Sequence, residues 1–114
     1  MYNYILVSEE KVKFHSIISV SELPPGERIF LSIGKASIVL FNIAGAYYAI
    51  EDVCSHDDGP VGEGEVEGTI ITCPRHGAKF DLRSGHAVAM PAVEDIPAYP
   101  VRVLDSTIQI GVPI

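Results

Sequence analysis

The residues of this chain best suited to chemistry are two cysteines that are each followed closely by a histidine. Cys54 is followed by His56 and Cys73 by His76, with 16 residues between His56 and Cys73. Each pair is short enough to lie on one loop, and two thiolates with two imidazoles form a complete four-ligand set for a metal. These are the only cysteines of the chain. A disulfide between them would leave both histidines unexplained, so we interpret both cysteines as metal ligands.

Short apolar runs surround these pairs and predict β-strands. The runs cover residues 12–18, 29–33, 37–41, 46–50, 69–72, 78–82, 87–90, 101–104 and 107–110. Turns are expected at 24–26, 42–45, 83–85 and 105–106, and in a proline-rich stretch around Pro97 and Pro100. Because no segment has a long helical stripe, we expect an all-β sandwich or barrel of antiparallel strands. Both ligand pairs then lie on loops at strand ends.

The bulk composition limits the class of protein. A chain of 114 residues fits a single domain, residues 1–114, and 47% hydrophobic residues can supply its core. The net charge of −7 disfavours nucleic acid and favours partners with basic surfaces. No secretory signal is visible, and the longest apolar stretch, residues 36–50, is too short to span a bilayer. We expect a monomeric cytoplasmic protein that binds neither membrane nor nucleic acid.

The spacing of the four ligands resembles the signature of the Rieske iron–sulfur domain, and the similarity extends over about residues 11–110. The resemblance implies a 2Fe-2S cluster in which Cys54 and Cys73 bind one iron and His56 and His76 bind the other. It also implies a small cluster-binding subdomain at about residues 52–92, made of the two ligand loops. The histidine-bound iron should lie nearest solvent and accept the electron.

The chain is most similar to the Rieske ferredoxins of aromatic-ring-hydroxylating dioxygenase systems. That likeness implies an electron carrier without catalysis of its own, which relays single electrons from an NAD(P)H-dependent flavin reductase to a terminal oxygenase. Two other interpretations stay open at this point. One is the Rieske-like small subunit of an assimilatory nitrite reductase, many of which lack the ligands. The other is an interaction module built around a structural zinc ion.

The residues next to the second ligand pair indicate a low reduction potential. High-potential Rieske proteins carry a serine and a tyrosine two and four residues after the second histidine, where this chain has Ala78 and Phe80. Neither side chain can donate a hydrogen bond to the cluster sulfurs. High-potential members also have a second cysteine pair, which is absent here. We therefore expect a potential near −150 mV, about the lower end of the Rieske range.

Three further features near the ligands have two interpretations each. The acidic run at residues 57–67 is either a docking patch for a basic partner or a solvated loop. Arg75, between two ligands, either contacts a partner or points to water, and we favour water. Pro91, in Met90-Pro91-Ala92, resembles the proline loop that covers the cluster in this family, although it could simply end a strand.

Overall fold

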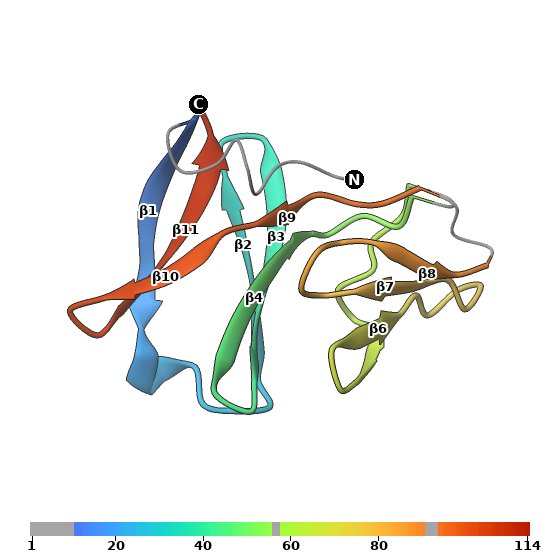
Figure 1. Ribbon diagram of the computed structural model, residues 1–114, viewed down its shortest axis with the longest axis horizontal. Helices are drawn as coiled ribbons and strands as arrows, with labels where there is room; N and C mark the ends of the chain where they lie inside the picture. The colour runs from blue at the N-terminus through green and yellow to red at the C-terminus, as the bar shows by residue number, and fades with distance from the viewer. Residues whose placement is uncertain (1–10, 56–57, 91–93) are drawn as a thin grey trace.

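The computed structural model describes residues 11–55, 58–90 and 94–114, and within these ranges the fold is almost entirely antiparallel β-structure (Figure 1). The strands are β1 (Val12–Ser19), β2 (Arg28–Ile33), β3 (Ala36–Ile43), β4 (Ala46–Glu51), β5 (Glu65–Glu67), β6 (Ile70–Thr72), β7 (Lys79–Asp81), β8 (Ala87–Ala89), β9 (Ala98–Tyr99), β10 (Val101–Leu104) and β11 (Thr107–Pro113). A 3-10 turn, η2 (Val20–Glu22), follows β1. Over the described ranges, the chain forms no helix long and apolar enough to cross a membrane.

The strands form three sheets that lie side by side along the longest axis of the molecule (Figure 1). Sheet A has the order β1-β11-β10, sheet B the order β2-β3-β4-β9, and sheet C the order β5-β6-β7-β8. Sheet B lies in the middle, and we call sheets A and B together the base. All of the pairings are antiparallel, as the sequence predicts for this fold class.

Strand β3 of sheet B is buried on both faces because its alternate residues enter two different cores. Ile38 and Leu40 point to sheet A and Val39 and Phe41 point to sheet C, as expected for successive side chains of a strand. The base core consists of Leu23, Ile38, Leu40, Ala49, Ile108 and Ile110. The second core, here the insertion core, consists of Val39, Phe41, Ile50, Cys54, Val61, Ile71, Cys73, Ala78, Phe80, Leu82, Ile96 and Ala98.

Sheet C and its loops are an insertion, residues 52–96, between two strands that pair with each other. The chain leaves the base at Glu51 and returns at Pro97, where the Glu51 N–H donates to the Pro97 carbonyl at 2.9 Å. Strand β9 then pairs with β4, with Ala49 opposite Tyr99 and Ile50 opposite Ala98. The two ends of the insertion are therefore fixed to the same strand, which anchors everything between them.

All of the predicted strands are present. Two further strands were not predicted, and one turn is shorter than we predicted. Strand β5 lies in the acidic run at residues 57–67, where we predicted no strand. Strand β9 lies in the expected proline-rich turn, and as an edge strand it tolerates the flanking prolines. The turn expected at 42–45 contains only Ala44 and Gly45, both with positive φ (54° and 96°), as a two-residue hairpin of the I′ kind requires.

Candidate metal centre

Cys54 and Cys73 begin two loops with the same backbone hydrogen-bond pattern. In the first loop the Cys54 N–H donates to the carbonyl of Gly59 (2.6 Å), and the N–H of Asp58 donates back to the Cys54 carbonyl (2.7 Å). In the second loop the Cys73 N–H donates to the Ala78 carbonyl (2.7 Å), and Gly77 donates back to Cys73 (3.1 Å). In both loops the partners are five and four residues after the cysteine. The two cysteines thus have the same pattern of backbone hydrogen bonds.

Each loop turns at a residue with positive φ, four residues after its cysteine. This residue is Gly77 in the second loop (φ 80°) and Asp58 in the first (φ 62°). Glycine adopts this conformation without a steric penalty, and aspartate is among the few other residues that tolerate it. The local sequence therefore selects the fold of both loops.

The two thiols lie together in the insertion core, whereas the described histidine of the set is on the surface. Cys54 and Cys73 are fully buried, and both belong to the same cluster of packed residues. They are thiols rather than a disulfide. His76 is exposed, as we predicted for the outer ligands, and His56 lies outside the described residues. A buried thiolate pair with an accessible imidazole fits a two-iron cluster that has its cysteine side inward.

The described residues do not provide the closely spaced ligand group that a single metal ion needs. Among them, no three His, Cys, Asp or Glu side chains lie close enough together to hold one ion, although Cys54, Cys73 and His76 are all described. His56, the fourth predicted ligand, lies outside the described residues.

Arg75 links the two loops. Its guanidinium donates to the carbonyl of Pro60 at 2.6 Å, which joins the second loop to the end of the first. Gly59 makes room for this contact, because a Cβ at that position would lie 2.8 Å from the guanidinium carbon. Arg75 is exposed, as we expected, and from this exposed position its guanidinium also binds the first loop.

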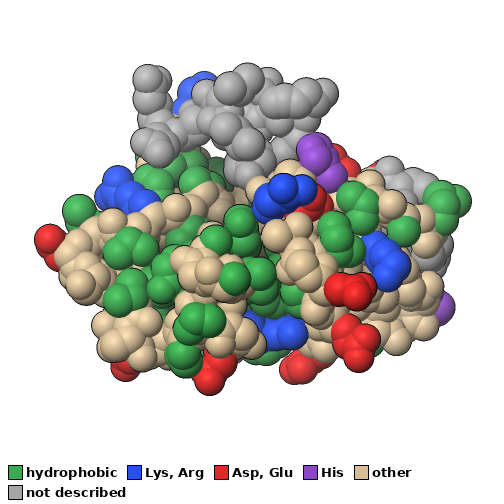
Figure 2. Space-filling model, turned by 60° about the horizontal axis from the view of Figure 1, so that its bottom comes forward, with side chains coloured by type: hydrophobic (Ala, Val, Ile, Leu, Met, Phe, Trp, Pro, Cys, Tyr) green, Lys and Arg blue, Asp and Glu red, His purple; other side chains and the backbone are tan. Residues whose placement is uncertain are grey.

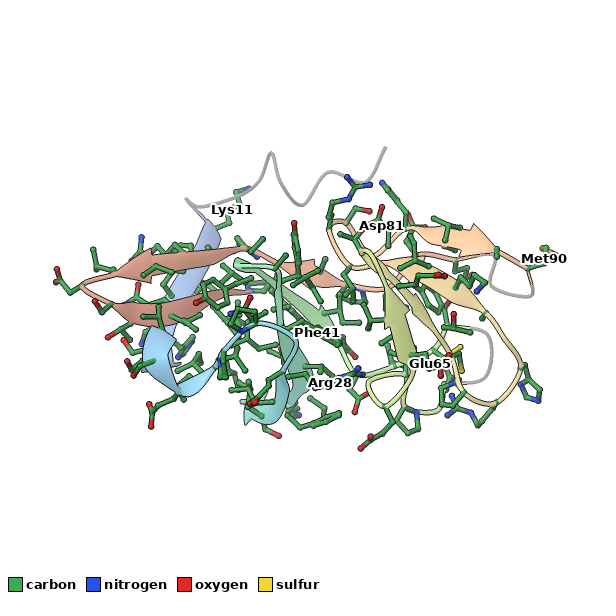
Figure 3. All side chains as sticks on the ribbon, turned by 90° about the horizontal axis from the view of Figure 1, so that it is seen from below. Lys11, Arg28, Phe41, Glu65, Asp81 and Met90 are labelled. Atoms are coloured by element: carbon green, nitrogen blue, oxygen red, sulfur yellow. The ribbon has the colours of Figure 1, made fainter. Side chains whose placement is uncertain are left out.

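A second contact joins the first loop to the chain that follows β8. The Ser55 hydroxyl donates to the carbonyl of Glu94. Met90, at the end of β8, is 75% exposed (Figure 3). Pro91 and Ala92 of the predicted covering loop lie outside the described residues, so its role stays a prediction.

Ala78 and Phe80 are fully buried in the insertion core next to the second loop. Neither side chain has a polar group, and the Ala78 carbonyl is occupied by the Cys73 N–H. The two positions at which high-potential members donate hydroxyl hydrogen bonds are thus filled here by hydrocarbon.

Two carboxyl groups of the insertion have a lowered pKa. For Asp81 the main cause is a side-chain hydrogen bond from the Arg83 guanidinium, 2.8 Å away. For Asp95 the pKa is lowered first by the Ala87 N–H, which donates to Oδ1 at 2.8 Å, and then by His86, whose Nδ1 is 2.8 Å from Oδ2. The hydrogen bonds of Asp95 hold the chain just after the predicted covering loop against β8.

Acidic side chains gather on the insertion. Glu63, Glu65 and Glu67 are exposed along and just before the edge strand β5, and Figure 2 shows acidic side chains on the half of the molecule where sheet C lies. Charged residues on an edge strand discourage pairing with other chains. Protection of this strand edge explains the acidic run without any need for a partner protein. The docking interpretation stays a prediction.

Comparison with known proteins decides the family. Residues 13–100 match the Rieske [2Fe-2S] domain, which is well over half of the chain. The chain belongs to this family. The cofactor of this Rieske chain is accordingly a Rieske-type 2Fe-2S cluster, and the buried thiols and exposed imidazole of the two loops fit it.

Relatives place this Rieske chain among the ferredoxins. It is 39% identical over 95 residues to the 3-phenylpropionate/cinnamic acid dioxygenase ferredoxin subunit of Shigella boydii, with 82% of this chain and 89% of the relative covered. The ferredoxin of Sphingomonas yanoikuyae B1 is 28% identical, with a TM-score of 0.79 over 89% of this chain and all of the other. The protein is therefore a Rieske ferredoxin, an electron carrier and not a catalytic component.

Two more distant structures share the fold. One is a chain from the complex of reduced oxygenase and oxidised ferredoxin in carbazole 1,9a-dioxygenase, with 24% identity and a TM-score of 0.79 over 85% of this chain and 91% of that one. The other is a nitrite reductase small subunit from Mycobacterium tuberculosis, with 21% identity and a TM-score of 0.77 over 90% and 97%. At these identities the likeness concerns the fold alone, so the nitrite reductase alternative gains no support from it.

Proposed function

We propose that Cys54, His56, Cys73 and His76 bind the 2Fe-2S cluster, and that the protein carries single electrons to the terminal oxygenase of an aromatic-ring-hydroxylating dioxygenase system. The observation that carries the ligand assignment is the pair of matching loops, which bring Cys54 and Cys73 into one buried core. The role in a dioxygenase system is supported by the ferredoxin subunit at 39% identity.

The ligand set divides into a structural and an accessible side. When bound, the cluster supplies a one-electron redox couple. The chain holds the two thiolates away from water, while His76 is exposed where a partner protein can touch it. We infer that an NAD(P)H-dependent flavin reductase and the oxygenase bind in turn to the face that contains His76, because the two cysteines are buried and cannot be reached from solvent.

The remaining expectations are part of this proposal. The cluster has a low potential because Ala78 and Phe80 donate no side-chain hydrogen bonds to it. The net charge of −7 suits basic partner surfaces. A cytoplasmic location is part of the same proposal. We further propose that the protein is a monomer and that residues 1–114 form one domain.

Visible absorption and EPR spectroscopy of the purified protein test the cluster assignment. We expect a coloured protein whose reduced form gives the Rieske EPR signal, with an average g below the free-electron value. His76→Cys should change this signal and lower the midpoint potential, because a thiolate replaces a neutral imidazole. A colourless protein without an EPR signal would overturn the proposal, and an unchanged spectrum in His76→Cys would remove His76 from the ligand set.

Protein-film voltammetry tests the low potential separately. We expect a midpoint near about −150 mV at neutral pH. A clearly positive midpoint would show that donors other than the missing hydroxyl groups stabilise the reduced cluster.

A further inference from the structure

Residues 61–64 lead from the first ligand loop into β5, and the backbone of this segment is bound by two charged side chains of opposite sign. We propose that Asp52 and Arg28 are positioning residues that hold Gly62 by its N–H and its carbonyl, respectively, and thereby fix the Cys54 loop against the Cys73 loop. This inference rests on the proposed role of the two cysteines as cluster ligands. Neither residue is a ligand in it, and neither was identified from the sequence.

Asp52 closes the first loop. One oxygen of its carboxylate, Oδ1, accepts hydrogen bonds from the N–H groups of Val61 (2.9 Å) and Gly62 (2.7 Å). Its own N–H donates to the carbonyl of Ser37 at 2.8 Å, which fixes it to the base. Because Asp52 precedes Cys54 by two residues, the carboxylate ties the far end of the loop back to the start.

Arg28 binds the same segment through its carbonyl groups. The Nη1 group of its guanidinium donates to the carbonyl of Gly62 at 2.6 Å and to that of Gly64 at 2.8 Å. The guanidinium carbon lies 5.0 Å from the centre of the Phe41 ring, a cation–π contact that orients the side chain. Figure 3 shows Arg28 next to Phe41, at the junction between the base and the strand that begins at Glu65. Arg28 thus bridges from β2 to the insertion.

Two glycines allow the segment to lie this close to its neighbours. A Cβ at Gly62 would be 2.5 Å from Val39 Cγ2 and 2.6 Å from the Phe30 ring. A Cβ at Gly64 would be 1.9 Å from the carbonyl oxygen of Thr72, the residue immediately before Cys73. The segment is therefore wedged between the base and the strand that leads into the second loop.

These contacts form one continuous path from one cysteine to the other. Asp52 connects the Cys54 loop to Gly62, Arg28 secures the segment from Gly62 to Gly64, and Gly64 packs on Thr72. A bound cofactor needs its ligands held to about 0.5 Å, and side chains behind the ligands supply that precision. Since the two charges are opposite, the pair adds no net charge beside the cluster.

The test compares charge-matched variants of the intact holoprotein. Asp52→Asn is compared with Asp105→Asn, which makes the same change in the β10–β11 turn of sheet A. Arg28→Met is compared with Arg102→Met, because Arg102 also lies over an aromatic ring, 3.9 Å from the centre of Phe14, but in sheet A. The measurements are the half-life of the cluster absorbance, the EPR line shape of the reduced protein and the midpoint potential.

We expect Arg28→Met to shorten the cluster half-life about tenfold or more, as other residues behind metal ligands do. Asp52→Asn should give a smaller loss, because its amide oxygen still accepts hydrogen bonds but without the charge. Both should broaden the EPR signal, and the two controls should not. The midpoint should fall in Arg28→Met, which loses a positive charge, and rise in Asp52→Asn, which loses a negative one.

The double variant tests whether the two side chains act together on one segment or act independently. Because both side chains bind the backbone of Gly62, Arg28→Met combined with Asp52→Asn should lose the cluster little faster than Arg28→Met alone. Hydrogen exchange at the amides of Val61 and Gly62 gives a readout that needs no cluster, and it should quicken in Asp52→Asn, which keeps the size of the side chain.

Several results would overturn the inference. They are half-lives and line shapes equal to those of the controls, losses that multiply in the double variant, or unchanged exchange at residues 61 and 62 in Asp52→Asn. A wild-type protein without a Rieske EPR signal would instead overturn the proposed function. The hydrogen-exchange experiment would still test whether Asp52 holds the segment.

Discussion

The base and the insertion are stabilised in different ways, although both are antiparallel β-structure. In the base, strands of up to eight residues pair over long registers, for example from Val12 opposite Pro113 to Ser19 opposite Thr107. In the insertion, each strand of sheet C has only three residues. Its loops are held by side chains that bind backbone groups, among them Asp52, Arg28 and Arg75. The scaffold relies on regular pairing, and the site relies on particular polar contacts.

This difference has a physical origin. A strand ladder satisfies its own backbone groups, whereas a turn that presents a metal ligand leaves several of them without a partner in a sheet. Side chains must then supply those partners, so each such contact carries more of the local structure than one pair in a ladder does. The insertion should therefore depend on its cofactor and on single residues, and the base should not.

Loss of a cluster ligand should give the largest difference between the insertion and the base. In Cys73→Ser we expect the cluster absorbance and EPR signal to disappear and the amides of β6 and β7 to lose protection from hydrogen exchange, because bound metal contributes folding free energy locally. The amides of β1, β3 and β11 should stay protected. If protection fell equally in all three sheets, the base would not be independent of the site.

Matched truncations in the two cores should sharpen the comparison. Ile71 and Ile108 are both fully buried, the first in the insertion core and the second in the base core. Ile71→Ala and Ile108→Ala should each lower the free energy of unfolding by about 2–5 kcal/mol, measured by urea denaturation. Only Ile71→Ala should also speed cluster loss, because its core contains both cysteines. Equal cluster half-lives in the two variants would contradict a separate insertion core.

The smallest effect that we expect is a loss of stability of the insertion at acidic pH. The folded pKa of Asp81 lies below its ordinary value of 3.8 because Arg83 binds the carboxylate. Its contribution to stability is complete above the ordinary value and is lost as the pH falls through the lower folded value. Asp81→Asn should therefore destabilise the protein near about pH 5 and have less effect near about pH 3.

Urea denaturation of Asp81→Asn at both pH values measures this change, with Asp105→Asn in the base turn as the control. A difference between wild type and Asp81→Asn that stays constant with pH would mean that the Arg83 contact contributes nothing to the folded insertion.

Much of the fold could be predicted because it depends on local patterns. The alternating runs located nine of the strands, and the hairpin between β3 and β4 followed from its turn residues. Strand β5 was missed because Glu65 and Glu67 favour solvent, and it is a strand only through its pairing with β6. Strand β9 was missed because Pro97 and Pro100 flank it, and only its edge position permits them.

The sequence by itself determined the candidate ligands: their types, their spacing and the absence of hydroxyl groups at positions 78 and 80. These are local, since a metal selects its donors and a short loop must present them. Tertiary structure alone decided what holds the loops in place. Arg28 reaches a carbonyl 34 residues away, and Arg75 one that is 15 residues away. A bond between a side chain and a distant backbone group leaves no periodic or compositional trace, so only the folded chain shows it.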